Sequence, residues 1–342
     1  MKWQEYVKAA ITLESLGLCA ARVSRASPFS SKGENAESSC PAANIKVLGL
    51  GGFGSRLVTR LAFEMRPSLG KAKSEPSFIA LDSDESSLPS GYMPLVQSVV
   101  VQGADSVLRS VGTLSARSLV VLIGGIGGAT GTALIQAAAQ QIKRTGALTV
   151  VVVSVELDEH LPGVALATQL AQLKDVSDVV FAIQQTVSLS PLDADAPVRE
   201  RARSLLNAER WMLHCVTGLL HAAILPARTT LGVNEIRSIL AGARWAGYGV
   251  ALGRVGLEAG KIGEKAIRQA LASREGAGQS DLRAALIVIS GPASQLRWTN
   301  VQAAMNEVCS LLGKTVSCLF GVQATEHSGY SDVKIQVWLA FS

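Results

Sequence analysis

The chain has 342 residues, of which 48% are hydrophobic and 17% are charged. This composition excludes a globally disordered protein and supports large buried cores, and the length suits two domains. The net charge is +5, but lysine and arginine are scattered and no basic run alternates with aromatic residues. We therefore expect no nucleic-acid partner.

The cysteines indicate a reducing compartment. There are five, at positions 19, 40, 215, 309 and 318, and they form no Cys-x-x-Cys pair. An odd number of widely spaced cysteines favours free thiols in the cytoplasm over disulfides or a structural zinc site, and we expect no metal site. No apolar run is long enough to cross a membrane, so we expect no direct membrane span.

Residues 1–43 are expected to form an N-terminal helix and a flexible linker. Trp3, Val7, Ala10, Ile11 and Leu18 recur at roughly helical spacing. Such a helix could pack on the body or a partner, or lie at a membrane surface as an interfacial helix. The stretch 27–43 is rich in serine, proline and small polar residues, which is typical of a linker, and ordered structure is expected to begin at Asn44.

Residues 44–197 alternate between apolar strands and helices. The pattern predicts strands at 45–50, 77–84, 118–125, 148–156 and 179–183, and helices at 55–65, 131–146 and 166–178. Strands that are apolar throughout and alternate with helices indicate a parallel sheet that is covered on both faces. The fold class is therefore α/β.

The rest of the chain follows a different pattern. A long helix at 198–224, within a segment 198–226, is expected to join two domains. Residues 227–342 then indicate a smaller α+β domain, with a strand at 282–291 and a helix at 299–313. The stretches 315–325 and 332–342 are expected to close it as an antiparallel pair.

The first predicted strand runs directly into the glycine loop "GLGGFGS", residues 49–55. A glycine turn between a strand and a helix brings backbone N–H groups and a helix N-terminus onto a phosphate. The same residues satisfy GxGxxG, and Asp82 or Asp84 follows the next strand, so an NAD-type dinucleotide domain is an alternative. A tight turn without a ligand is the simplest alternative.

A second glycine loop favours a different ligand. "GGIGGATGT", residues 124–132, again follows a strand and precedes a helix. One dinucleotide domain needs only one such loop. Two loops at the carboxyl ends of one parallel sheet can hold a single polyphosphate between them, and the helix dipole favours its negative charge.

These two loops resemble the tubulin/FtsZ family. "GGIGGATGTA" is similar to the family signature GGGTGTG, and "IKVLGLGGFGSRLV" is similar to the first phosphate loop of FtsZ. The resemblance covers roughly residues 44–342. It implies a Rossmann-like GTP-binding domain at 44–197, a central helix at 198–226 and an activation-type domain at 227–342. It also implies GTP or GDP as ligand, which a magnesium ion can accompany.

The resemblance assigns candidate binding residues by position. They are Gly51, Gly52, Phe53, Gly54, Ser55, Gly127, Gly128, Ala129, Thr130, Gly131, Asp158 and Glu209. Phe53, Ala129 and Ala133 stand where the family has glycine. Arg56 replaces an asparagine and could contact phosphate or remain solvated. Glu209 stands where the family contacts guanine, and an exposed helix residue is the alternative.

The residues that carry catalysis in the family match this chain less well than the glycine loops do. In the family, subunits stack head to tail and a loop of the next subunit positions the attacking water. Its pattern Asn-x-Asp-x-x-Asp aligns with residues 230–235, where Thr230 and Gly232 replace polar residues and only Glu235 keeps a carboxylate. The segment with the γ-phosphate sensor is short, with Gly103-Ala104-Asp105 as a remnant, and the family arginine falls on Pro162. Whether the chain is an active GTPase therefore stays open.

Three functions remain at this stage. The first is an FtsZ-like GTP-binding cytoskeletal protein that assembles head to tail, in cell division, with weak or lost hydrolysis. The second is a pseudo-GTPase that modulates or co-assembles with another FtsZ. The third is an NAD-binding oxidoreductase, which lacks a catalytic set because the four histidines are isolated. The chain stops at the last strand, so we expect it to lack the tail that binds membrane adaptors.

Overall fold

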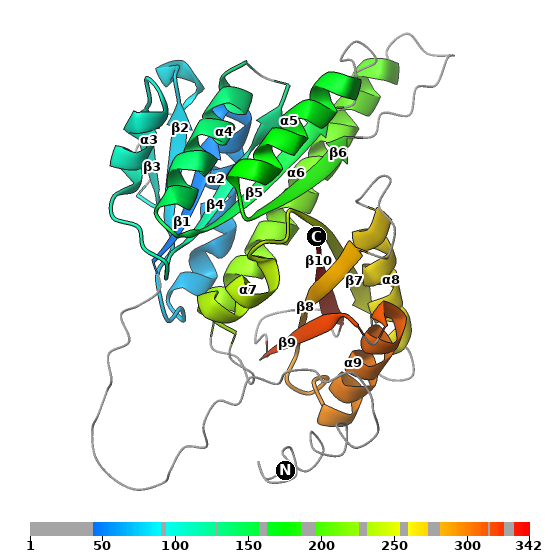
Figure 1. Cartoon of the computed structure of the whole chain (residues 1–342). Helices are drawn as coiled ribbons and strands as arrows, with labels where there is room; N and C mark the ends of the chain where they lie inside the picture. The colour runs from blue at the N-terminus through cyan, green and yellow to red at the C-terminus, as the bar shows by residue number, and fades with distance from the viewer. Residues whose placement is uncertain are drawn as a thin grey trace, which may run out of the picture.

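The computed structural model describes residues 44–89, 94–127, 129–156, 163–185, 196–225, 231–253, 259–272, 281–313, 315–324 and 332–342. The expected N-terminal helix and linker lie outside these residues. The described strands form one sheet in the order β3-β2-β1-β4-β5-β6-β7-β10-β8-β9. Figure 1 shows this sheet with helices packed against it.

The first half of the sheet is parallel, as the sequence predicts. Its strands are β1 (Ile45–Leu50), β2 (Ser77–Asp82), β3 (Val96–Val100), β4 (Leu119–Ile126), β5 (Leu148–Glu156) and β6 (Val179–Gln185). Strands β1, β4 and β5 are almost completely buried. Both faces of these strands are apolar, which is why helices must cover both.

The helices divide between the two faces. One apolar cluster gathers side chains from α3 (Ala104–Val111), α4 (Ala129–Arg144), α5 (Gly163–Val176), α8 (Ala259–Ala272) and α9 (Trp298–Leu312). The other gathers α2 (Gly51–Leu69), α6 (Ala196–Ile224) and α7 (Val233–Leu240). A short 3-10 helix, η1 (Glu85–Ser87), follows β2.

The second half of the sheet corrects one sequence expectation. Its strands are β7 (Trp245–Gly253), β8 (Leu282–Gly291), β9 (Ser317–Ala324) and β10 (Val333–Phe341). The last two strands were expected to pair with each other, and this is wrong. Strand β9 pairs in parallel with β8, whereas β10 lies antiparallel between β7 and β8. The reason is that α9 forms a crossover between β8 and β9, which leaves the opposite edge of β8 to β10.

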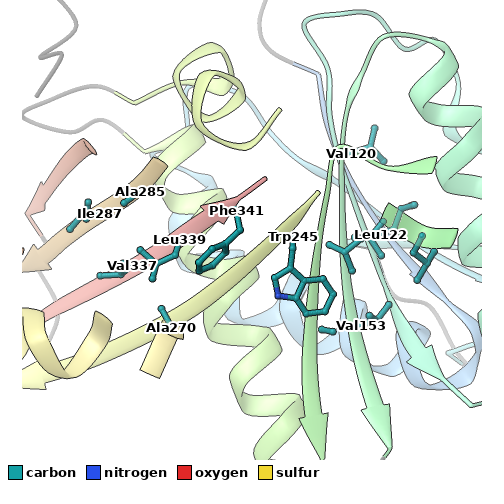
Figure 2. Close-up of a cluster of buried hydrophobic side chains, with 14 of the residues drawn as sticks. Val120, Leu122, Val153, Trp245, Ala270, Ala285, Ile287, Val337, Leu339 and Phe341 are labelled. Carbon is teal, nitrogen blue, oxygen red and sulfur yellow. The ribbon is translucent and has the colours of Figure 1, made fainter. Parts of the chain in front are cut away.

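Trp245 connects the two halves. Its backbone makes the recorded pairing between β6 and β7, opposite Val180. In Figure 2 its indole lies between Leu122 and Val153 on one side and Phe341 on the other. The indole is 9% exposed, and the Lys174 ammonium lies 4.4 Å from its ring centroid. Because the strands here share so little backbone pairing, packing around Trp245 carries much of this connection.

Helix α6 makes a second connection, through side chains of the C-terminal half. The Gln336 amide on β10 donates to the His214 carbonyl on α6 and to the Tyr248 hydroxyl on β7, at 3.1 and 2.8 Å. It reaches the helix because Gly218 has no side chain: a Cβ there would lie 2.2 Å from Gln336 Nε2 and 2.9 Å from the Trp338 ring. The contact therefore depends on a glycine inside a helix.

Several elements were not predicted individually. Strands β3 and β7 and helices α3, α7 and α8 have no separate prediction, although their residues fall within the predicted domains. Helix α2 also begins earlier than expected, at Gly51 instead of residue 55. The glycine loop is itself the first turn of the helix. The division of the chain into domains at α6 stays a prediction.

We predict that Gly218→Ala destabilises the protein. The added methyl group must displace Gln336 or Trp338, and overpacking of this kind costs about 1–3 kcal/mol, although alanine favours a helix by up to about 1 kcal/mol. Urea unfolding measures the free energy of unfolding. Gly70→Ala is the control, because nothing lies within 4 Å of a Cβ there. A Gly218→Ala variant as stable as the parent would contradict the prediction.

We predict that His221, on α6, makes the protein sensitive to acid. Burial, with a smaller contribution from the Lys334 charge, lowers the pKa of His221 from 6.5 to about 4. Between these values the unfolded chain binds the proton and the folded chain does not, so stability is lost as the pH falls from 6.5 to 4. The loss from this group approaches about 3 kcal/mol. Unfolding across this range should show it, and His221→Phe should show a smaller pH dependence.

Candidate functional site

The two glycine loops meet at the carboxyl edge of the parallel strands. Strands β1 and β4 are neighbours, and their register pairs Leu50 with Gly124. Gly51 follows β1 with a φ of +73°, and a Cβ on it would lie 3.2 Å from the Cα of Gly131 in α4. The two predicted glycine loops therefore lie side by side, and their backbones approach each other closely.

The first loop also needs glycine for its close contact with the sheet. A Cβ on Gly54 would lie 2.3 Å from the carbonyl oxygen of Ile123 on β4. No side chain larger than hydrogen fits at that distance. The glycines thus hold the first turn of α2 directly against the strand that leads into the second loop.

The start of α2 has no side-chain cap from Leu50, the residue that precedes the helix, and its first turn contains no acidic residue. The first turn of α4 also contains no acidic residue. At the second loop, the N–H of Gly127 donates to the Thr132 hydroxyl at 3.3 Å. Because N–H groups and helix dipoles converge here, the edge favours an anion.

Phe53 and Ser55, near the start of α2, lie in different surroundings. The half-buried Phe53 ring packs over Gly125, 3.7 Å from the position of a Cβ there. Ser55 is fully buried, and its hydroxyl has no hydrogen-bond partner within the described chain. An unpaired buried hydroxyl of this kind costs about 1–3 kcal/mol. Arg56 is exposed on the same turn.

The acidic residues after β2 are engaged locally. Asp82 is buried, and one of its oxygens accepts from the Asp84 N–H at 3.2 Å. Its other oxygen lies 3.9 Å from the position of a Cβ on Gly52. Asp84 in turn accepts from the backbone and hydroxyl of Ser86. The carboxylate of Asp82 thus lies beside the first loop.

The described residues hold no group of three or more histidine, cysteine, aspartate or glutamate side chains that could bind a metal ion. The described residues also include no helix that is both long and apolar enough to span a membrane.

Glu209 lies on α6, next to a cation of α2. Its carboxylate is 3.9 Å from the Arg60 guanidinium on α2, and its side chain is 15% exposed. Glu209 therefore has a competing cation beside it, and its contact with guanine stays a prediction. The sequence did not single out Arg60, since pairing between distant helices leaves no local signal.

Glu235 already has a structural partner. It lies in the first turn of α7, where its carboxylate accepts from the N–H of Gly232 at 2.9 Å. This bond satisfies a donor at the start of the helix and is one half of a capping box. The carboxylate of the candidate catalytic residue Glu235 is therefore occupied within its own chain.

Helix α7 lies at the opposite edge of the sheet from the glycine loops. Arg237 donates to the carbonyl of Ser118 at 3.3 Å, and Ser118 precedes β4 at its amino end. The second glycine loop follows the carboxyl end of the same strand. Eight residues of strand β4 separate them, or about 23 Å. Sequence reasoning missed Arg237, whose partner is far away in the chain.

The remaining candidates are only partly described. Ala129 and Thr130 begin α4, where the backbone alone is described. Gly128, Asp158 and Thr230 lie outside the described residues. Gly103, of the suggested sensor remnant, precedes α3 and follows β3, at the same edge as the glycine loops.

The chain is similar to FtsZ proteins in sequence and in fold. FtsZ of Mycoplasmopsis pulmonis is 26% identical over 315 residues, which cover 86% of this chain and 76% of that protein. A point mutant of FtsZ from M. jannaschii superposes with a TM-score of 0.69 at 20% identity, covering 87% of this chain and 91% of the other. No family model matches the chain.

The chain is thus similar in sequence to FtsZ and has the fold of the FtsZ/tubulin superfamily. A further structure with this fold is a GTPγS-bound protofilament of CetZ2 from Haloferax volcanii, with a TM-score of 0.63 and 17% identity over 86% of this chain and 92% of that one. With identities of 26% or less, these proteins are distant relatives of the chain.

We predict that Glu235→Ala lowers the free energy of unfolding by about 1 kcal/mol, because the Gly232 N–H loses its acceptor. Glu235→Gln keeps an acceptor oxygen at the same reach and should cost less. Glu264→Ala is the control, since it removes only an exposed pair with Arg268. Chemical denaturation of the three variants checks the order, and equal stability of Glu235→Ala and the parent would contradict it.

Proposed function

We propose that this protein is an FtsZ-like cytoskeletal protein that binds GTP or GDP between its two glycine loops. It assembles head to tail, and its hydrolysis of GTP is weak or lost. The observation that carries the binding proposal is the close approach of Gly51 to Gly131 at the start of two helices.

A nucleotide triphosphate suits this edge for physical reasons. A polyphosphate presents oxygens to the backbone donors of both helix starts, and the absence of bulky side chains from Gly51 and Gly131 leaves room against the backbone. Two CetZ structures with this fold support a nucleotide ligand, because one is bound to GTPγS and the other to GDP. Asp82 is the residue beside the loop that could hold a magnesium ion brought with the phosphates.

Head-to-tail assembly follows from the positions of the two loops. The glycine loops lie at one edge of the sheet and α7 lies at the other, about 23 Å away along β4. Glu235 therefore cannot reach a nucleotide on its own chain. A second copy that stacked its α7 edge on the glycine-loop edge would bring Glu235 to the phosphates. The GTPγS-bound protofilament of CetZ2, which has the same fold, supports such stacking.

Weak hydrolysis follows from the chemistry of the α7 edge. Positioning of the attacking water supplies much of the rate in phosphoryl transfer. Glu235 would have to leave the Gly232 N–H to orient that water, and Gly232 has no side chain to help it. The protein should therefore keep nucleotide and assemble with little turnover. A chain with these properties could also modulate filaments of another FtsZ.

We predict that purified protein binds GTP and scatters light when GTP is added, with little release of phosphate. Gly51→Ala should weaken GTP binding by roughly tenfold or more, because its methyl group is strained at positive φ and meets Gly131. Gly70→Ala is the matched control and should bind normally. Equilibrium binding, light scattering and phosphate release are followed on the same samples.

The outcomes separate the parts of the proposal. Normal GTP affinity of Gly51→Ala, or tight binding of NADH without GTP, would sink the ligand assignment. Rapid phosphate release that Glu235→Gln abolishes would contradict the proposal of weak hydrolysis. Binding without scattering, together with altered scattering of an added FtsZ, would favour the modulating role over self-assembly.

A further inference from the structure

Helices α2 and α6 lie side by side on one face of the sheet and run in the same direction. The Glu209 carboxylate on α6 is 3.9 Å from the Arg60 guanidinium on α2. Further along both segments, the N–H of Lys73, just after α2, donates to the carbonyl of Ile224, the last residue of α6, at 2.9 Å. The two contacts follow the same order along both segments, so the helices are parallel neighbours.

Each of these helices turns a stripe of exposed side chains outward. Residues that are three or four positions apart lie on one side of a helix. The exposed residues with this spacing are Arg56, Arg60, Phe63 and Pro67 on α2 and Leu206, Arg210 and His214 on α6. Both helices bury their opposite sides in the same apolar cluster, so the two stripes point away from the sheet together. We call them the α2–α6 face.

The α2–α6 face and its margin are basic. Within the segments 56–73 and 206–214, six lysines and arginines stand against two carboxylates. Both carboxylates are already shared by one cation, because Glu64 lies 3.2 Å and Glu209 3.9 Å from the Arg60 guanidinium. The other five cations therefore give this side of the molecule a net positive charge.

Two large apolar side chains project from this basic face. Phe63 is 50% exposed and Leu206 is 59% exposed, and they are two of the five large apolar residues that are exposed among the described part of the chain. Cations attract anionic headgroups, while apolar side chains next to them can enter the boundary between headgroups and acyl chains. The combination on the α2–α6 face suits that boundary.

We propose that the α2–α6 face binds the surface of a membrane that contains anionic phospholipids. The chain would lie on the membrane without crossing it, with Phe63 and Leu206 among the headgroups and the arginines against the phosphates. The inference does not rest on the proposed binding of GTP, because the face is exposed in the chain as it stands.

Other partners fit this face less well. A second copy of the chain carries the same net charge of +5 and would be repelled. Residues 1–43 contain five basic and four acidic residues, so they supply no acidic stretch that matches the face. A single-stranded nucleic acid is bound on several stacking aromatic side chains, whereas Phe63 is the one aromatic residue of the two stripes. An anionic lipid surface is the partner that uses both the charge and the apolar side chains.

The test is sedimentation of the purified full chain with vesicles, without nucleotide. We expect the chain to sediment with vesicles made of equal parts phosphatidylglycerol and phosphatidylcholine, and not with vesicles of phosphatidylcholine alone. Binding should be strong at about 0.05 M salt and weak at about 0.5 M, because salt screens the attraction between exposed charges.

A pair of charge variants locates the binding surface. Each basic residue near an anionic surface contributes ~1 kcal/mol, or about fivefold in affinity, so Arg56→Gln with Arg210→Gln should weaken binding by about 25-fold. The matched control is Lys261→Gln with Lys265→Gln. It removes the same charge from exposed positions of α8, which packs on the opposite face of the sheet, and should bind nearly as the parent does.

A second pair of variants tests the apolar contribution. Phe63→Ser should weaken vesicle binding by roughly fivefold, because the ring no longer enters the headgroup boundary. Leu311→Ser on α9 is the control, since Leu311 is also exposed but lies on a helix of the opposite face, and it should bind as the parent does. Circular dichroism confirms that each variant is folded.

Three results would overturn the proposal. The first is equal sedimentation of the parent with anionic and neutral vesicles, or none with either. The second is equal binding by the parent and the Arg56→Gln/Arg210→Gln variant, or an equal loss in the α8 control, since another surface or the net charge alone would then be responsible. The third is binding of a DNA oligonucleotide but not of vesicles, which would assign the face to nucleic acid.

Discussion

The register between β1 and β4 is the constraint on which the site depends. Because Leu50 pairs with Gly124, the two chains leave the sheet side by side, and Gly51 comes against Gly131. A shift of this register would separate the loops, and the convergence of two helix starts would be lost. The buried strands on either side hold the register, since each is apolar on both faces and enclosed by neighbours.

The same sheet gives the molecule a direction. Parallel strands place the glycine loops at their carboxyl edge, and Arg237 ties α7 to the amino end of β4. A site built from both edges cannot form within one chain, whereas stacking of copies in one direction can form it. This geometry is what links nucleotide binding to assembly in our proposal. The bond from Glu235 to the Gly232 N–H is the reason to expect binding without efficient turnover.

The two halves of the sheet are held together by side chains. Trp245 packs across the junction between β6 and β7 (Figure 2). Gln336 reaches α6 because Gly218 has no side chain. Much of the fold was predictable, because the apolar strands and the helix at 198–224 have strong local patterns. The pairing of β9 and β10 was not predictable, because the sequences of the two strands do not show which edge of β8 each one pairs with.

The candidate site was also predictable only in part from the sequence. The sequence by itself determined the α/β class, the two glycine loops and their family, since short glycine motifs after apolar strands are local signals. Only the tertiary structure decided that Glu209 faces Arg60 and that α7 lies at the far edge. These facts depend on contacts between residues distant in the chain. Such contacts arise from packing, which no local pattern encodes.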